Sequence, residues 1–152
     1  MLRRATPEDA DALATILRAA MQKAMPSLPE LHTPEEDRSF LREMVLPNEE
    51  VWVIERDAQI VGFAALGSRQ DVDYLQHIYV GTEHQGRGVG SELFTHAKKR
   101  RPAGFRLWVF QRNEGARRFY ERHGCRLVEL TDGSGNEEKE PDALYEWRPN
   151  PL

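Results

Sequence analysis

Few features of secreted or membrane proteins occur in this chain. It has one cysteine in 152 residues, so no internal disulfide can form, which suits a reducing compartment. No uninterrupted apolar run approaches the ~18–20 residues of a membrane helix, and the first residues lack the apolar core of a signal peptide. We expect a cytoplasmic protein with no membrane partner. The length predicts one domain over residues 1–152.

Basic residues are not in excess either. Lys and Arg number 21 against 25 Asp and Glu, and they are not interleaved with stacking aromatic residues, which argues against nucleic-acid binding. We also expect no metal site. The charge is nevertheless uneven, because residues 76–126 carry eleven basic and four acidic side chains, and the remainder carries ten basic and 21 acidic. The basic segment suits a partner with several phosphates, and the acidic remainder suits a cationic ligand such as an amine.

Apolar periodicity and turn residues predict the order of elements. Two helices are expected after the Thr-Pro-Glu start signals at residues 6–8 and 33–35. Strands are expected over residues 2–5, 51–55, 59–66, 73–80, 107–110, 126–130 and 143–148, with further helices over 91–101 and 114–123. The order is therefore β-α-α-β-β-β-α-β-α-β-β. Cys125 follows a helix-stopping glycine and is interpreted as a core residue.

The most informative segment is Gln85-Gly86-Arg87-Gly88-Val89-Gly90-Ser91, between strand 73–80 and helix 91–101. Three glycines remove side chains where a strand passes into a helix. The exposed N–H groups and the positive helix end then converge on one spot, which favours a phosphate or pyrophosphate. A glycine-rich turn with no ligand is the alternative.

Two common nucleotide motifs do not fit this segment. The dinucleotide fingerprint requires a third glycine where the chain has Ser91, and an acidic residue about twenty positions further on, where it has Arg106 and Leu107. A P-loop requires Gly-Lys-Ser/Thr, which does not follow. The pattern that fits is Gln-x-x-Gly-x-Gly, beginning at Gln85.

A second segment follows strand 107–110. Asn113 is a favourable N-cap and Gly124 a favourable helix end. Asn113, Arg117 and Tyr120 are spaced i, i+4, i+7, so they lie along one side of the helix. The segment reads Asn-x-x-Ala-x-x-Phe-Tyr-x-x-x-Gly. Together with the glycine segment it resembles the GNAT superfamily of acetyl-CoA-dependent N-acetyltransferases, over residues 72–126.

The resemblance implies an α/β (α+β) fold: a mixed, mostly antiparallel sheet of six to seven strands, flanked by about four helices. In the family, strands four and five splay apart and the pantetheine of acetyl-CoA lies between them. The residues that the resemblance assigns to acetyl-CoA are Ile78, Tyr79, Val80, Gln85, Gly86, Arg87, Gly88, Val89, Gly90, Ser91, Asn113, Ala116, Arg117, Phe119 and Tyr120.

Two catalytic roles follow from the resemblance. The backbone N–H of Val80, or of its neighbour Ile78, is expected to polarise the thioester carbonyl. Tyr120 is expected to act as the general acid that protonates the departing thiolate, because a phenol and a thiol have similar pKa values. Packing beside Phe119 is the alternative role for Tyr120. Asn113 is expected to cap its helix, and its amide is a candidate ligand of a pantetheine carbonyl.

The general base is the point at which the chain departs from the family pattern. Family members often carry a carboxylate or histidine eleven or nine residues before the motif glutamine, where this chain has Tyr74 and Gln76. Asp73 and His77 flank these positions, but they point to the opposite face of a regular strand. A bulge between them would reverse one of the two, so His77 is a candidate base. The last hairpin or a water chain are alternatives.

The acceptor is expected between the first two helices and the final hairpin. The candidate residues are His32, Trp52, Tyr74, Glu137 and Glu138. We expect a small cationic primary amine that attacks acetyl-CoA directly in a ternary complex. The alternatives are a protein or peptide N-acetyltransferase and a non-catalytic acyl-CoA-binding sensor or regulatory module. A homodimer is compatible with the sequence.

Overall fold

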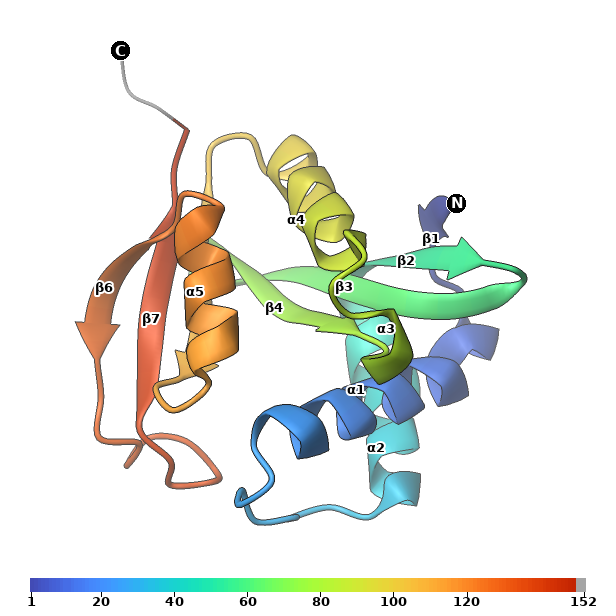
Figure 1. The fold of residues 1–152 in the computed structure, drawn as a ribbon, viewed down its shortest axis with the longest axis horizontal. Coiled ribbons are helices and arrows are strands. Elements are labelled where there is room, and N and C mark those ends of the chain that lie inside the picture. The colour runs from blue at the N-terminus through green and yellow to red at the C-terminus, as the bar shows by residue number, and fades with distance from the viewer. Residues whose placement is uncertain (150–152) are drawn as a thin grey trace.

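A computed structural model describes residues 1–149 of the chain. The sheet strands are β1 (Leu2–Arg4), β2 (Glu50–Arg56), β3 (Gln59–Arg69), β4 (Val72–Val80), β5 (Phe105–Phe110), β6 (Arg126–Leu130) and β7 (Asp142–Trp147). The main helices are α1 (Ala10–Ala24), α2 (Pro34–Phe40), α4 (Val89–Arg100) and α5 (Glu114–Arg122). The expected order of elements and the mixed, mostly antiparallel fold are confirmed (Figure 1).

The two N-terminal helices contain irregular turns. A 3-10 turn, Pro7–Asp9, precedes α1, and its cap is the expected Thr6. The second helix is capped by Thr33, becomes a π-helix over Leu41–Val45 and ends as the short α3, Leu46–Asn48. π-Helical turns are often found at functional sites. Here the π-helical turn leads through α3 into β2.

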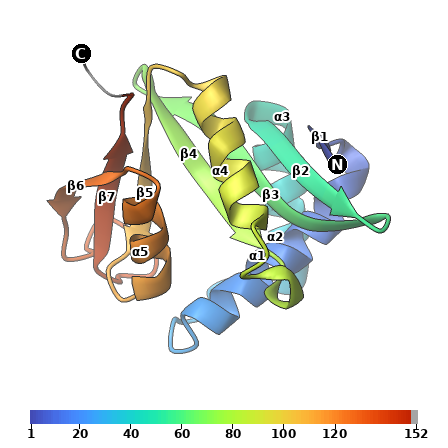
Figure 2. The ribbon, with the colours of Figure 1, turned by 45° about the horizontal axis from the view of Figure 1, so that its top comes forward.

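All seven strands belong to one sheet, in the order β1-β2-β3-β4-β5-β7-β6. Neighbouring strands are antiparallel except β4 and β5, which are parallel. The sheet therefore consists of two antiparallel parts, β1–β4 and β5-β7-β6. Figure 2 shows the two parts diverging from the end where β4 and β5 begin.

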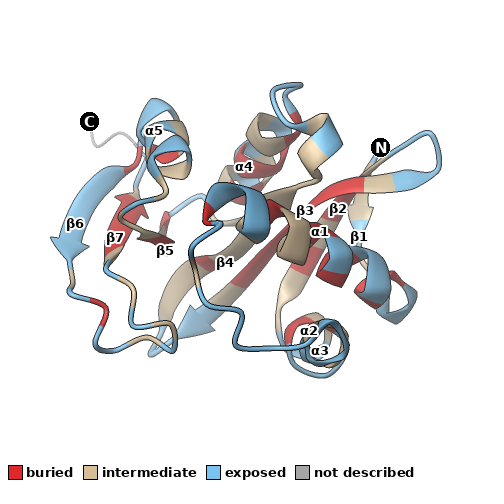
Figure 3. Cartoon of the chain, turned by 60° about the horizontal axis from the view of Figure 1, so that its bottom comes forward, coloured by how far each residue is buried: buried red, intermediate tan, exposed pale blue. Residues whose placement is uncertain are grey.

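Helices cover the two faces of the sheet unequally. α1 and the π-helical turn pack on one face of β2 and β3, with Leu13, Leu41 and Phe63 fully buried between them. On the opposite face α4 and α5 share a larger core that includes Phe94 and Tyr145. Strand β6 is exposed along its whole length (Figure 3). Cys125 is buried in the larger core, as expected, and its pKa is raised to about 12 by burial.

Among residues 1–149, no helix has the length and apolar character needed to cross a bilayer.

Candidate functional site

The site begins at the divergence of β4 and β5. The two parallel strands are paired at Tyr74 and Arg106, and no further register pair follows toward their C-terminal ends within residues 1–149. In a regular parallel pair, the positions after Tyr74 would continue to bond to β5. The strands instead splay apart, which the sequence alone did not reveal.

The splay leaves backbone amides of β4 without a neighbouring strand. Val80 lies opposite Gly62 and Ile78 opposite Ala64 in the antiparallel pair with β3. The next residue, Gly81, donates its N–H to the Val61 carbonyl at 2.8 Å. Because hydrogen-bonded pairs alternate along antiparallel strands, the N–H groups of Val80 and Ile78 point toward β5 and the gap.

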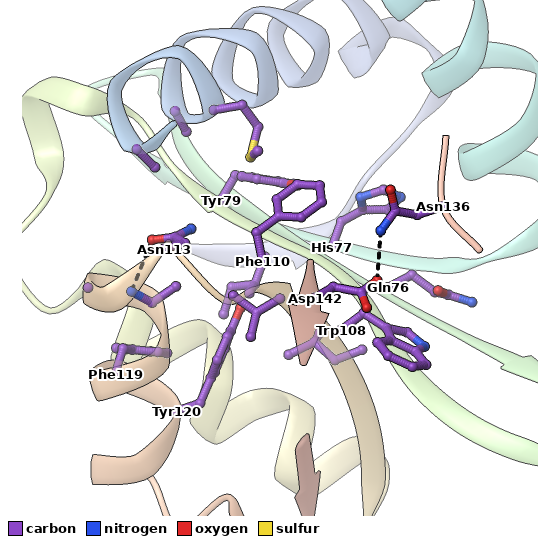
Figure 4. Close-up of a pocket in the computed structure, with 18 of the residues that line it drawn as sticks. Gln76, His77, Tyr79, Trp108, Phe110, Asn113, Phe119, Tyr120, Asn136 and Asp142 are labelled. Atoms are coloured by element: carbon purple, nitrogen blue, oxygen red, sulfur yellow. Dashed lines mark hydrogen bonds between the residues drawn. The ribbon is translucent and has the colours of Figure 1, made fainter. Parts of the chain in front are cut away.

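A groove of about 1650 Å³ occupies this gap. Its walls come from β4, β5, α5, the ends of α1 and α2, and the β6–β7 loop. Figure 4 shows Tyr79, Phe110 and Tyr120 around its middle, with Asn113 toward one end and Gln76, His77 and Trp108 toward the other. The splay therefore connects the glycine segment to the acidic C-terminal loop through one continuous space.

The glycine segment at one end of the groove is shaped for an anionic group. Gly86 and Gly88 have φ of 78° and 86°, a conformation that L side chains rarely adopt, and nothing lies within 4 Å of where their Cβ atoms would be. The first hydrogen bond of α4 runs from Glu92 N–H to the Gly88 carbonyl, so the preceding helix amides have no intrahelical partner. Bare amides at a helix N-terminus fit a pyrophosphate.

Gln85 and Gly90 serve this segment structurally. The Gln85 side-chain amide donates to the Val80 carbonyl at 3.2 Å, which ties the turn to the end of β4. At Gly90, a Cβ would lie 3.4 Å from the Phe119 ring and 3.6 Å from Val80 Cγ2. A glycine at this position lets α4 approach α5 closely. Both residues line the groove.

Two tyrosines face the middle of the groove. Tyr120 lies on α5 and is buried, and burial raises the pKa of its hydroxyl well above the ordinary value. Tyr79 lies on β4, and burial raises its pKa to about 12. Ionisation of Tyr79 would raise the pKa of Tyr120 further, so the two side chains are close enough to interact. Both hydroxyls therefore stay protonated in the neutral pH range.

The start of α5 has the expected cap. The Asn113 side-chain oxygen accepts a hydrogen bond from Ala116 N–H at 3.2 Å (Figure 4). Asn113, Ala116 and Phe119 line the groove, whereas the Arg117 guanidinium donates to the Tyr145 hydroxyl at 3.0 Å and is not part of the lining. Of the three residues spaced i, i+4, i+7, Asn113 and Tyr120 therefore line the groove and Arg117 does not.

Comparison with known proteins identifies the family. The family model for the acetyltransferase (GNAT) domain matches residues 47–125, more than half of the chain. This chain belongs to the GNAT acetyltransferase family. Membership makes the domain an acyltransferase whose acyl donor is acetyl-CoA, and the glycine turn and the groove described above fit that donor.

Relatives and solved structures agree with this assignment. The chain is similar to the peptidyl-lysine N-acetyltransferase YiaC of Escherichia coli, 29% identical over 90 residues, or 59% of each protein. An uncharacterized N-acetyltransferase of Archaeoglobus fulgidus is 29% identical over 123 residues, 67% of this chain and 83% of the relative. The fold matches that of the PaiA N-acetyltransferase of Thermoplasma acidophilum, solved with coenzyme A, with a TM-score of 0.79, 21% identity and 98% coverage of both chains. The match to the E. coli enzyme covers less than two thirds of that enzyme's length.

Not every residue that the GNAT resemblance suggested for acetyl-CoA lines the groove. Arg87, Gly88, Val89 and Ser91 are absent from its lining. Val89 is buried in the core, and the Ser91 hydroxyl contacts His123 Nε2 at 3.1 Å. Gly88 shapes the turn through its backbone.

The residues suggested for the acceptor are divided between the groove and other places. Glu137 and Glu138 line the groove, and Glu137 Oε1 lies 2.6 Å from His32 Nε2. Side chains alternate along β2, so Trp52 points away from the α1 face. It packs instead on His96 of α4, with ring centroids 4.2 Å apart. Tyr74 is also outside the groove lining, next to Arg106. We leave Trp52 and Tyr74 out of the proposed acceptor site.

A bulge in β4 settles which way His77 points. Ala65 lies opposite His77 and Leu66 opposite Leu75, so Gln76 is the extra residue. The His77 side chain therefore points toward α2, and the ring centroids of His77 and Phe40 lie 5.9 Å apart. His77 lines the groove, and its Nδ1 is buried without a hydrogen-bond partner among residues 1–149. Burial, together with the nearby charge of Arg69, lowers its pKa to about 4, so it is a weak base.

Glu49 is a functional candidate that the sequence analysis missed. It lies between α3 and β2 and lines the groove, with Oε1 buried and without a partner among residues 1–149. Burial raises the pKa of its carboxyl to about 7, although the nearby Arg69 charge opposes this. Alternation along β2 puts Glu49 on the same side as the buried Val51 and Val53, which is the sequence signal that could have revealed it.

Proposed function

We propose that the protein transfers the acetyl group of acetyl-CoA to the primary amine of a small cationic acceptor, by direct attack in a ternary complex. The observation that carries this proposal is the single groove between β4 and β5, which runs from the glycine turn to the acidic β6–β7 loop. Such a groove can hold donor and acceptor together.

Charged residues along the groove favour an anionic donor at one end and a cationic acceptor at the other. Arg118 and Arg122 on α5 line the end near Gly86, where phosphates would lie. Glu137, Glu138 and Asp142 line the other end. An amine that carries positive charge is attracted to these carboxylates.

We assign two steps to residues in the middle of the groove. The Val80 N–H, and beside it that of Ile78, donates to the thioester oxygen, where negative charge develops during acyl transfer. The Tyr120 hydroxyl donates a proton to the departing sulfur, and its raised pKa keeps it protonated at the pH of the reaction. Asn113 and Phe119 position the pantetheine arm from α5.

The test is release of free coenzyme A by purified protein supplied with acetyl-CoA and a panel of amines. The panel contains spermidine, free amino acids, small aromatic amines and a lysine-containing peptide. We expect amine-dependent release by the wild type and a loss of roughly ten- to a hundredfold in kcat for Tyr120→Phe. The affinity of Tyr120→Phe for acetyl-CoA, measured by calorimetry, should be unchanged.

Tyr79→Phe is the matched control, because it removes the other groove hydroxyl. An equal loss of kcat in both variants would contradict a specific role for Tyr120. Calorimetric binding of acetyl-CoA with no release for any amine would contradict the enzyme and support the acyl-CoA-binding module instead.

A second acceptor class has specific support. The E. coli relative is named a peptidyl-lysine N-acetyltransferase, and a groove of about 1650 Å³ is large enough to take a lysine side chain beside the donor. Higher kcat/KM for the lysine peptide than for spermidine and the other small amines would select this class.

A further inference from the structure

One carboxylate in the groove, that of Glu49, comes from a side chain beside β4. The β4 positions that often carry the base in the family hold no carboxylate here. The position nine residues before Gln85 is Gln76, which cannot accept a proton from an ammonium group at neutral pH. In the structure Gln76 is the bulged residue of β4, and its side chain lies beside the carboxylate stem of Glu49. The Glu49 side chain thus lies beside β4, although it comes from another part of the chain.

Gly67 on β3 makes this arrangement sterically feasible. A Cβ at Gly67 would lie 3.2 Å from Glu49 Cγ and 3.4 Å from Gln76 Cγ, so both side chains occupy the space above the glycine. Three segments that are distant in sequence therefore converge at the acceptor end of the groove. Because Gly67 has no side chain, Glu49 can fold over β3 toward β4.

We propose that Glu49 is the general base of this acetyltransferase. The inference rests on the proposed function, since it concerns the amine acceptor of that reaction. Glu49 takes a proton from the acceptor ammonium group, which frees the nitrogen lone pair for attack. The bond from nitrogen to the acetyl carbon forms, and the carbon–sulfur bond breaks. The nitrogen then loses its second proton, which replaces the proton that Tyr120 gives to sulfur, and Glu49 releases its own proton to solvent.

The surroundings of Glu49 suit this role. Burial holds its pKa at about 7, much closer to that of an alkylammonium group than an ordinary carboxyl. The other titratable and charged groups of this end of the groove are Lys23 from α1, Arg69 from β3, His77 and Tyr79 from β4, Glu137 and Glu138 from the β6–β7 loop, and Asp142 at the start of β7. Among them His77 is a rival base, but its pKa of about 4 leaves it poorly matched.

The experiment compares the pH dependence of kcat for wild type, Glu49→Gln and Glu49→Asp, with spermidine or the lysine peptide as acceptor, whichever reacts faster. We expect wild-type kcat to rise with pH through about 7, as Glu49 loses its proton. Glu49→Gln should lose about a hundredfold in kcat at pH 7, keep its affinity for acetyl-CoA, and lack this rise. Glu49→Asp should retain the rise at reduced rate.

Glu43→Gln is the control for removal of a carboxylate, because Glu43 is exposed on the neighbouring π-helical turn. A Glu49→Gln variant that kept wild-type kcat and the rise near pH 7 would overturn the assignment and leave the proposed function standing. A raised acceptor KM at unchanged kcat would also overturn it, because Glu49 would then only bind the acceptor. Loss of the rise in His77→Gln but not in Glu49→Gln would give the role to histidine. A wild type that acetylates no amine would remove the proposed function and this inference together.

Discussion

At the scale of single residues, burial decides which groups of the groove can do chemistry. Glu49, His77 and Tyr120 all have pKa values shifted toward their neutral forms, because each loses contact with water. These shifts have different consequences. Tyr120 stays protonated and can donate a proton, His77 is a weak base, and Glu49 can act as a base near neutral pH. The residue types were visible in the sequence, whereas their burial was not.

The shift at Glu49 also predicts how stability depends on pH. A carboxyl whose pKa is raised on folding stabilises the native state at low pH, and this contribution is lost as pH rises from about 4.5 through about 7. Glu49→Gln should therefore be more stable than wild type at pH 8, by an amount on the order of 1–2 kcal/mol given its partial exposure, and nearly equal at pH 4. Thermal unfolding followed by circular dichroism at both pH values measures this.

Glu43→Gln, which removes an exposed carboxylate, should show no such difference between the two pH values. A Glu49→Gln variant destabilised equally at pH 4 and pH 8 would mean that the carboxylate is held by favourable contacts, and the inferred base would lose its physical support.

At the scale of elements, the junction of β4, the glycine turn and α4 forms the donor end of the groove. Its geometry depends on two glycines in left-handed conformations and on the Gln85 contact with Val80. These residues are adjacent in sequence, so the junction can be recognised from its residue types alone. The helix end and the bare amides follow directly from the local order of strand, glycines and helix.

Gly88→Ala tests this junction. Its φ of 86° makes alanine strained there, although nothing lies within 4 Å of the added Cβ. We expect a loss of roughly 1–2 kcal/mol in unfolding free energy, or an equivalent weakening of acetyl-CoA binding if the turn relaxes instead. Calorimetric titration with acetyl-CoA and a denaturant melt separate the two outcomes.

Gly115→Ala is the matched control for stability alone. Gly115 also has nothing within 4 Å of an added Cβ and lies in helix α5, where alanine is favoured, but it lines the groove. Unchanged stability and unchanged acetyl-CoA affinity in Gly88→Ala would show that the left-handed turn is not required.

At the scale of the whole molecule, the two parts of the sheet enclose the groove between them. They are joined by the Tyr74–Arg106 pairing at one end and approach again through the His32–Glu137 contact between two loops. The β6–β7 loop brings acidic residues to the acceptor end, but not all with the same role. Glu140 pairs with Arg112 through two contacts of 2.7 and 2.8 Å, so it holds the loop in place and is not available to attract a ligand.

The remaining carboxylates predict the charge preference of the acceptor site. The double variant Glu137→Gln/Glu138→Gln should raise KM for a cationic acceptor about three- to tenfold at low salt, with little change in kcat. The effect should shrink at high salt, because exposed charges are screened. Steady-state kinetics at two salt concentrations measures both.

Two variants control for this prediction. Glu43→Gln/Glu129→Gln removes the same charge from exposed positions outside the groove and should leave KM unchanged. His32→Gln breaks the His32–Glu137 contact but keeps the Glu137 charge, so KM should not rise. A rise in His32→Gln equal to that in the double variant would assign the effect to the contact between the loops and not to attraction of the acceptor.

Features that depend on neighbouring residues could be predicted from the sequence. The order of elements, the glycine turn, the Asn113 cap and the position of Tyr120 on its helix all follow from local pattern, because their geometry is set within a few residues. The family assignment also follows from these segments. Other features required the folded structure, because they depend on segments far apart in the chain: the splay of β4 from β5, the bulge that turns His77, and the meeting of Glu49, Gly67 and Gln76. Pairing between distant strands and burial by distant helices set these features, and neither leaves a pattern within one stretch of sequence.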